Sequence, residues 1–104
     1  MCKFCDYQEG AAKFATEEIS VAQRLVGLMS EVGELAQVYD RLWRKSEKSP
    51  ESCVEFREQI QEELGDILWY VAQLATTEGF DLQKIAHRNL TKLVSRNQPK
   101  ESRT

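Results

Sequence analysis

The sequence predicts an all-α protein, built as a bundle-like protomer of four helices. Apolar residues recur in steps of three and four over long stretches, which is the period of an amphipathic helix. No stretch alternates with the period of a strand, and only two prolines and five glycines occur among 104 residues. Because a chain of this length buries only a modest core, we expect further copies to complete the bundle.

The N-terminal half predicts two helices. A short helix with one apolar edge is expected within residues 3–15. Ser20 and Gln23 have the spacing of a capping box, so a second helix should begin near Val21 and end in the polar stretch 44–48. The expected core-facing seam of this helix is heptad-like and consists of Val21, Leu25, Leu28, Val32, Leu35, Tyr39 and Leu42.

Two further helices are expected in the C-terminal half. Residues 49–51 read Ser-Pro-Glu, a helix start signal. The third helix should face the core with Cys53, Phe56, Ile60, Leu64, Ile67, Val71 and Leu74. Gly79 is the expected C-cap of that helix and Asp81 the N-cap of the next. The last helix should face the core with Leu82, Ile85, Ala86, Asn89, Leu90 and Leu93. We therefore expect one helical domain over residues 1–97 and a polar tail over 98–104.

The overall charge argues against a nucleic-acid polymer as partner, since the formal net charge is −3 and the pI is near 5.2. No apolar run approaches the roughly 18 residues of a membrane span, and no signal-peptide segment follows Met1. We expect a cytoplasmic protein without membrane association.

The three cysteines argue against a disulfide framework, because their number is odd and no secretory context is present. Cys2 and Cys5 form a lone C-x-x-C motif. A zinc site there would need Cys53 and His87 as further ligands. Free thiols are the favoured interpretation.

A short acidic motif occurs twice, at residues 31–35 and 63–67. Each copy reads acid, aliphatic, glycine, acid, aliphatic. The acids are Glu31, Glu34, Glu63 and Asp66. Two acids three residues apart lie within roughly 60° on a helix face. Both pairs occupy the same flank relative to their seams, so antiparallel packing of the two helices would bring them to a shared cleft.

Four carboxylates in one cleft would repel one another, which favours a hard divalent cation such as Mg²⁺ or Mn²⁺. The alternative is that the acids merely solvate a helix flank. Gly33 and Gly65 weigh against it, because each helix-interior glycine costs about 1 kcal/mol and their matching positions indicate a close approach by backbone or ligand. Di-iron is excluded, since such sites need Glu-x-x-His and Lys84 precedes His87 at that spacing.

Five other residues are candidates for binding a ligand. Tyr70 follows Asp66 by one turn and either stacks on a ligand or fills the core rim. Asn89 interrupts an apolar stripe and either satisfies helix ends or binds a polar ligand. Lys92 and Arg96 suit phosphate oxygens or are surface charges. Trp43 caps the core or covers a flat base, and the core is the favoured interpretation.

The sequence resembles the MazG-type nucleoside triphosphate pyrophosphohydrolases of the all-α NTP pyrophosphatase superfamily. The resemblance extends from Tyr7 to Arg96 and rests on residues 27–35, 62–70 and 89–93. The family pattern, E-x-x-E followed at a distance by E-x-x-D, is met by Glu31, Glu34, Glu63 and Asp66.

This resemblance implies hydrolysis of (deoxy)nucleoside triphosphates to the monophosphate and pyrophosphate, for nucleotide-pool housekeeping, by dimers or tetramers. The four acids would hold Mg²⁺, Lys92 and Arg96 would contact phosphates, and Tyr70 and Asn89 the sugar or base. Two alternatives remain open: a sibling pyrophosphohydrolase, acting on dUTP or phosphoribosyl-ATP, and a non-catalytic helical interaction module.

Overall fold

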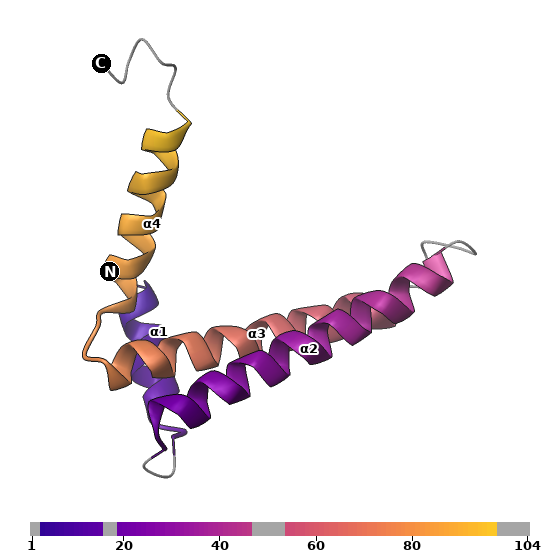
Figure 1. The fold of residues 1–104 in the computed structure, drawn as a ribbon, viewed down its shortest axis with the longest axis horizontal. Coiled ribbons are helices and arrows are strands. Elements are labelled where there is room, and N and C mark those ends of the chain that lie inside the picture. The colour runs from indigo at the N-terminus through magenta and orange to yellow at the C-terminus, as the bar shows by residue number, and fades with distance from the viewer. Residues whose placement is uncertain (1–2, 16–18, 47–53, 98–104) are drawn as a thin grey trace.

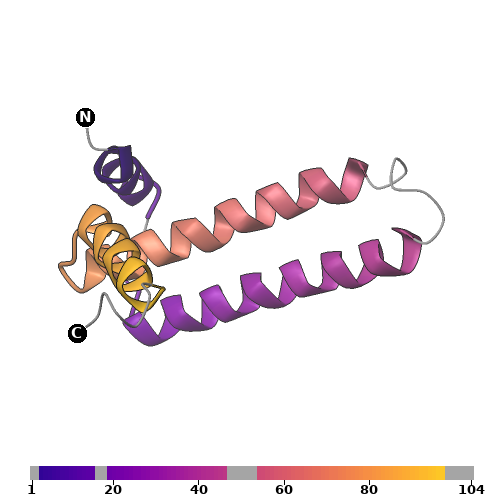
Figure 2. The ribbon, with the colours of Figure 1, turned by 90° about the horizontal axis from the view of Figure 1, so that it is seen from above.

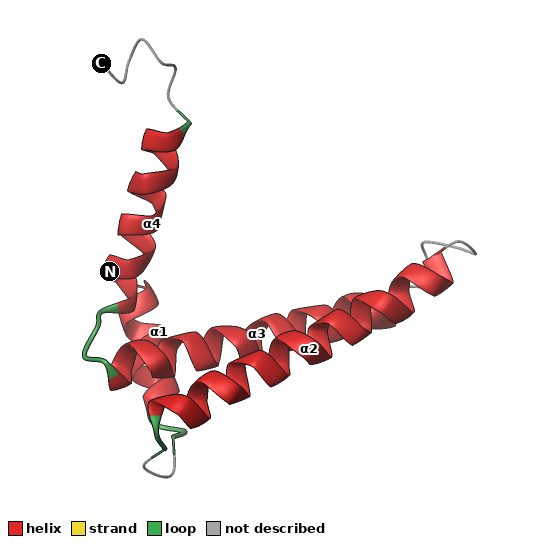
Figure 3. Ribbon diagram, viewed as in Figure 1, coloured by secondary structure: helices red, strands yellow, loops and turns green. Residues whose placement is uncertain are grey.

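Four helices form the protein in the computed structural model, which describes residues 3–15, 19–46 and 54–97. The helices are α1 (Lys3–Ala12), α2 (Val21–Ser46), α3 (Val54–Thr77) and α4 (Leu82–Arg96). Within these ranges no strand occurs (Figure 3), which confirms the predicted all-α class. None of the described helices is both long and apolar enough to cross a membrane.

The two long helices, α2 and α3, lie side by side and antiparallel as a hairpin (Figures 1 and 2). The short helix α1 packs on α3 and α4 near the C-terminal end of α3. Helix α4 starts at the same end and extends away from the hairpin. The long hairpin is therefore the scaffold on which the acidic motifs are placed.

The predicted capping box fixes the start of α2. The amide N–H of Gln23 donates to Ser20 Oγ at 3.1 Å, and the amide N–H of Ser20 donates to Gln23 Oε1 at 3.1 Å. Each side chain thus satisfies a backbone N–H that lacks a partner in the helix.

The predicted caps between α3 and α4 are also confirmed. Gly79 has φ of 75°, and the N–H of Phe80 donates to Ala75 O at 2.7 Å, as in a Schellman motif. The Asp81 carboxylate accepts from the N–H groups of Gln83 and Lys84 at the start of α4. The start signal predicted at 49–51 lies outside the described residues.

Gln8 of α1 anchors this turn. Its Nε2 donates to Phe80 O at 2.9 Å and to Thr76 Oγ1 at 3.0 Å, while its Oε1 accepts from the N–H of Leu82 at 2.9 Å. One side chain therefore holds α1 against both α3 and the first turn of α4.

The core consists of two small clusters. One joins α1, α3 and α4 through Ala11, Ala72 and Leu82, and there Trp69 Nε1 donates to Ala11 O at 3.2 Å. The other joins the far half of the hairpin through Val38 and Phe56. The core is thus divided along the hairpin.

The predicted seam of α2 is confirmed only in part, because Leu28, Leu35 and Leu42 are partly buried but its other members are exposed. Val21, Leu25, Val32 and Tyr39 are exposed, whereas Arg24 and Val38 are buried and Glu31, midway between them, is partly buried. On α3, Leu64 is likewise exposed and Glu63 partly buried. The acidic stripe of α2 therefore shares the hairpin interface with one side of the predicted seam. The predicted seam of α3 is largely confirmed, since apart from Leu64 its described members are buried or partly buried: Phe56, Ile60, Ile67, Val71 and Leu74.

The core positions predicted for α4 are wrong beyond its first turn, with the exception of Ala86, which is partly buried. Leu82 is buried, but Ile85, Asn89, Leu90 and Leu93 are exposed. The reason is the direction of α4, which leads away from the hairpin (Figure 1).

The expectation of free thiols is wrong for Cys5, which is disulfide-bonded. A disulfide sulfur offers no thiolate, so Cys5 in this state is not a zinc ligand. Cys2 and Cys53 lie outside the described residues.

Candidate metal centre

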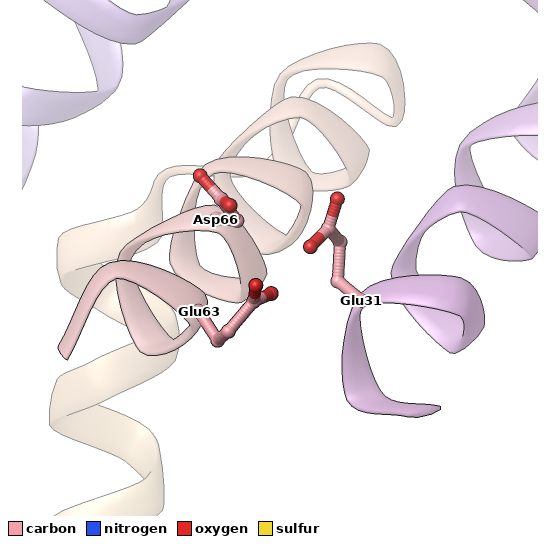
Figure 4. Close-up of side chains that lie close together, drawn as sticks. All are labelled: Glu31, Glu63 and Asp66. Atoms are coloured by element: carbon pink, nitrogen blue, oxygen red, sulfur yellow. The ribbon is translucent and has the colours of Figure 1, made fainter. Parts of the chain in front are cut away.

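Three carboxylates from the two long helices converge in the middle of the hairpin. Glu31 of α2, Glu63 of α3 and Asp66 of α3 each offer an oxygen, and these oxygens all lie within 4.8 Å of one another. Figure 4 shows Glu31 and Glu63 reaching toward each other from facing helices, with Asp66 beside them. The i,i+3 spacing puts Glu63 and Asp66 on one side of α3, as the sequence predicted.

A close contact between the helices stabilises this register. A Cβ added to Gly27 would lie only 2.6 Å from Cζ and 2.7 Å from Oη of Tyr70. Gly27 therefore allows the tyrosine ring to lie directly against the α2 backbone. Gly27 precedes Glu31 by four residues and Tyr70 follows Asp66 by four, so this contact lies about one turn from the acids.

The described residues provide neither hydrogen-bond donors for the buried oxygens of the acidic cluster nor a positive charge paired with its carboxylates. Oε2 of Glu31 and Oε2 of Glu63 are buried without a hydrogen-bond partner. No lysine or arginine in the described ranges forms an ion pair with the three carboxylates. Burial, the hydrogen bond with Glu63 and the negative charges of Glu34 and Asp66 raise the pKa of Glu31 to about 7. The cluster therefore favours either an extra proton or a cation.

A hard divalent cation fits this donor set. Carboxylate oxygens are the ligands that Mg²⁺ and Mn²⁺ prefer, and the buried oxygens without donors are aligned for a positive charge. The residues that would hold the ion are Glu31, Glu63 and Asp66.

Glu34, the fourth predicted acid, lies at the edge of the cluster. It is exposed and is not among the residues whose oxygens meet within 4.8 Å. It is nevertheless near enough for its charge and a hydrogen bond to raise the pKa of Glu31. The structure thus brings three of the four acids together and leaves the fourth beside them.

The close approach expected at Gly33 and Gly65 is not made by the described residues. A Cβ on either residue would meet no described atom within 4 Å. Gly27, which lies outside the repeated acidic motif, is the glycine that a neighbouring side chain approaches closely.

The other predicted ligand-binding residues are spread over the molecule. Tyr70 is half-buried beside the cluster and its ring is edge-on to Trp69, with centroids 5.2 Å apart. Asn89, Lys92 and Arg96 lie on α4, which extends away from the hairpin (Figure 1). Trp43 is 76% exposed, so the favoured core interpretation of this residue is wrong. The protomer alone does not gather these groups around the acids.

Tyr7 of α1 is a neighbour of the cluster that the sequence did not reveal. Burial and the negative charge of Asp66 raise the pKa of Tyr7. Tyr7 also packs against Ala11, Ala72 and Leu82. Its place on the apolar edge of a short helix was readable from the sequence, but the crossing of α1 over α3 was not.

The raised pKa of Glu31 predicts a pH dependence of stability in the metal-free protein. In the folded protein Glu31 keeps its proton up to about pH 7, because its pKa is raised to about 7. In the unfolded chain the same carboxyl group loses its proton near its ordinary pKa of 4.5. Protonated Glu31 therefore contributes fully to the free energy of unfolding below pH 4.5, and this contribution is lost as the pH rises through 7. In EDTA, we expect the melting temperature to fall over that window, and to fall less in Glu31→Gln.

Glu58→Gln, an exposed charge change on α3, is the matched control and should keep the wild-type slope. Identical slopes in the wild type and Glu31→Gln would contradict the assignment of the raised pKa to Glu31.

Comparison with known proteins identifies the family. Residues 20–100 match the MazG nucleotide pyrophosphohydrolase domain, a range that contains all four acids. The chain is also 42% identical over 71 residues to the gene 37 protein of Mycobacterium phage L5; the match covers 68% of this chain and spans 60% of that relative's length. No solved structure matches significantly. The chain belongs to the MazG nucleotide pyrophosphohydrolase domain family.

Proposed function

We propose that this protein hydrolyses (deoxy)nucleoside triphosphates to the monophosphate and pyrophosphate with Mg²⁺, as housekeeping of the cytoplasmic nucleotide pool. The observation that carries the proposal is the convergence of Glu31, Glu63 and Asp66 within the MazG-matched region. Mn²⁺ is an alternative ion for the same oxygen ligands.

The proposed roles of the acids follow from their positions. Glu31, Glu63 and Asp66 hold the cation between the two helices, and Glu34 completes the set from the exposed side. When bound, the metal supplies charge neutralisation of the triphosphate and acidification of a water for attack on phosphorus. Orientation of the phosphates then depends on cations of the chain, because little covalent chemistry is required of the protein.

Helix α4 provides suitable cations. Lys84, Arg88, Lys92 and Arg96 recur every four residues and therefore lie along one side of the helix. Asn89 and Lys92, with Ile85 and Arg88, line an open groove of about 410 Å³. We assign phosphate binding to Lys92 and Arg96, and sugar or base contacts to Tyr70 and Asn89. Trp43 is proposed to contact the base of the substrate only in an oligomer, where another copy of the chain would bring it to the site.

An oligomer would bring these groups to the acids. Val26 and Met29 on α2 and Leu90 and Val94 on α4 are all more than 60% exposed. Apolar surface on this scale typically marks an interface. We propose a homodimer or homotetramer in which α4 of one copy packs against the hairpin of another and directs Lys92 toward the acidic cluster.

Replacing a proposed metal ligand should abolish turnover without unfolding the protein. We expect Glu34→Gln and Asp66→Asn to lower Mg²⁺-dependent pyrophosphate release by at least about 100-fold, because metal-bound charge stabilisation is lost. Circular dichroism should remain helical, and Glu58→Gln should keep wild-type activity.

Full activity in either variant would contradict the metal assignment, and release of orthophosphate in place of pyrophosphate would contradict the reaction. The same assay with canonical and modified nucleotides, dUTP and phosphoribosyl-ATP separates this activity from its sibling reactions.

The proposed assembly is tested by sedimentation velocity at micromolar concentration. The wild type should sediment as a dimer or larger species of the 12.0 kDa chain. Leu90→Asp, which puts a charge on the exposed apolar face of α4, should shift the protein toward monomer. Gln61→Asp, which adds the same charge at an exposed position of α3, should not. A monomeric wild type would rule the assembly out.

A further inference from the structure

A stripe of apolar side chains runs along the outer side of α2 and stays exposed in the protomer. Its members are spaced alternately by three and four residues, which is the period of a helix-packing seam, and they extend over about 26 Å. Helices α1 and α4 pack mainly on α3 and on each other at one end of the hairpin (Figure 2), so the stripe is left open. All of its six members are exposed: Ala22, Leu25, Met29, Val32, Ala36 and Tyr39.

The stripe lies on the face of the hairpin opposite the acids. Val32 and Glu34 are two residues apart on α2 and therefore point about 200° apart around the helix axis. Leu64 and Asp66 stand in the same relation on α3, and Leu64 is also exposed. Because Glu34 and Asp66 lie on the side of the candidate metal centre, Val32 and Leu64 lie on the other side. A partner on this apolar face would therefore leave the acids open to a ligand.

The stripe is complementary to a second copy of itself when two α2 helices pack antiparallel. The relevant register places Met29 of one copy opposite Val32 of the other, and the remaining layers follow by moving four and then three residues toward either end. Each layer occurs twice because of the two-fold symmetry, and each pairs a larger with a smaller side chain: Met29 with Val32, Leu25 with Ala36, and Tyr39 with Ala22. Such pairing lets the layers interdigitate. A register shifted by one heptad would instead place Met29 against Tyr39, two large side chains.

Gly33 gives an independent reason for the same register. A Cβ on Gly33 would meet no described atom within 4 Å, so no described contact within the protomer requires a glycine there. Glycine inside a helix is destabilising relative to alanine. Gly33 follows Val32 at the edge of the stripe, and Val26 follows Leu25 at the same edge. In the antiparallel register Val26, which is 65% exposed, lies next to Gly33 of the other copy, where the missing side chain leaves room for it.

We propose that two copies of the chain pack through this stripe, α2 antiparallel to α2, as a two-fold dimer of hairpins whose acidic faces point outward. The occupant is a second copy because the stripe is complementary to itself, which is the property that a two-fold interface requires. This interface does not depend on the proposed catalytic activity, and it is separate from the α4 contact proposed above. Where the two contacts join different pairs of copies, the assembly is a tetramer.

Charge substitutions within the stripe test the interface. Met29→Glu and Val32→Arg should each shift the protein to a species of about half the wild-type mass in sedimentation velocity at micromolar concentration, because the charge would be buried between apolar side chains. Gln37→Glu, at an exposed position on the polar side of α2, is the matched control and should sediment as the wild type does.

The register is tested by mixing the two variants. In the proposed register Met29→Glu of one copy faces Val32→Arg of the other, so an equimolar mixture should recover the wild-type species through a Glu–Arg pair. In parallel packing, or in the register shifted by one heptad, the two substituted positions do not face each other. A mixture that stays dissociated therefore overturns the proposed packing.

Circular dichroism shows whether each variant is still helical. If either variant of this layer is not helical, Tyr39→Glu mixed with Ala22→Arg tests the same register at another layer. A monomeric wild type, or a Met29→Glu protein of wild-type mass, overturns the inference. Neither measurement requires a nucleotide, so a dimer that passes these tests without hydrolysing any nucleotide contradicts only the proposed function.

Discussion

Electrostatic repulsion within the hairpin interface is the constraint on which the rest of the structure depends. Glu31, Glu63 and Asp66 occupy the stripe where α2 faces α3, and their oxygens lie within 4.8 Å of one another. The fully buried apolar residues lie on either side of the acids: Val38 and Phe56 at one end of the hairpin, and Ala72 at the other end, where α3 packs against α1 and α4. A cation bound between the helices would neutralise the repulsion among the three carboxylates and would link α2 to α3 through their oxygens.

The same arrangement explains the unusual surface. Because the acids take the inward stripe, the aliphatic residues next to them, such as Val32 and Leu64, lie outward. Helix α4 likewise exposes Leu90 and Leu93 beyond its first turn. A protomer with a divided core and many exposed apolar side chains is the form expected of a subunit, and this expectation supports the proposed assembly.

Features encoded by neighbouring residues could be predicted from the sequence. The capping box of Ser20 and Gln23 and the cap residues Gly79 and Asp81 depend on local hydrogen bonds and backbone angles, and the structure contains each of them. The grouping of Glu63 with Asp66 depends only on the helical period. Their convergence with Glu31 needed one further assumption, antiparallel packing, which a short connection makes natural.

Features that depend on tertiary packing could not be predicted. A seam read from apolar residues alone places Val32 inward and Glu31 on a flank, because hydrophobic periodicity does not anticipate that a functional group occupies the interface. The direction of α4 is set by a few contacts at one turn, including those of Gln8, and no periodic pattern encodes it. The burial of Arg24 and Gln73 became visible only once α2 was in place against α3.

The most direct test of the central claim, that the acidic cluster is a divalent cation site, is a calorimetric titration of Mn²⁺ into the metal-free protein above pH 7, where Glu31 is ionised. We expect saturable binding to the wild type that weakens at least about tenfold in Glu63→Gln and is unchanged in Glu58→Gln. Absence of binding to the wild type, or equal affinity in Glu63→Gln, would contradict it.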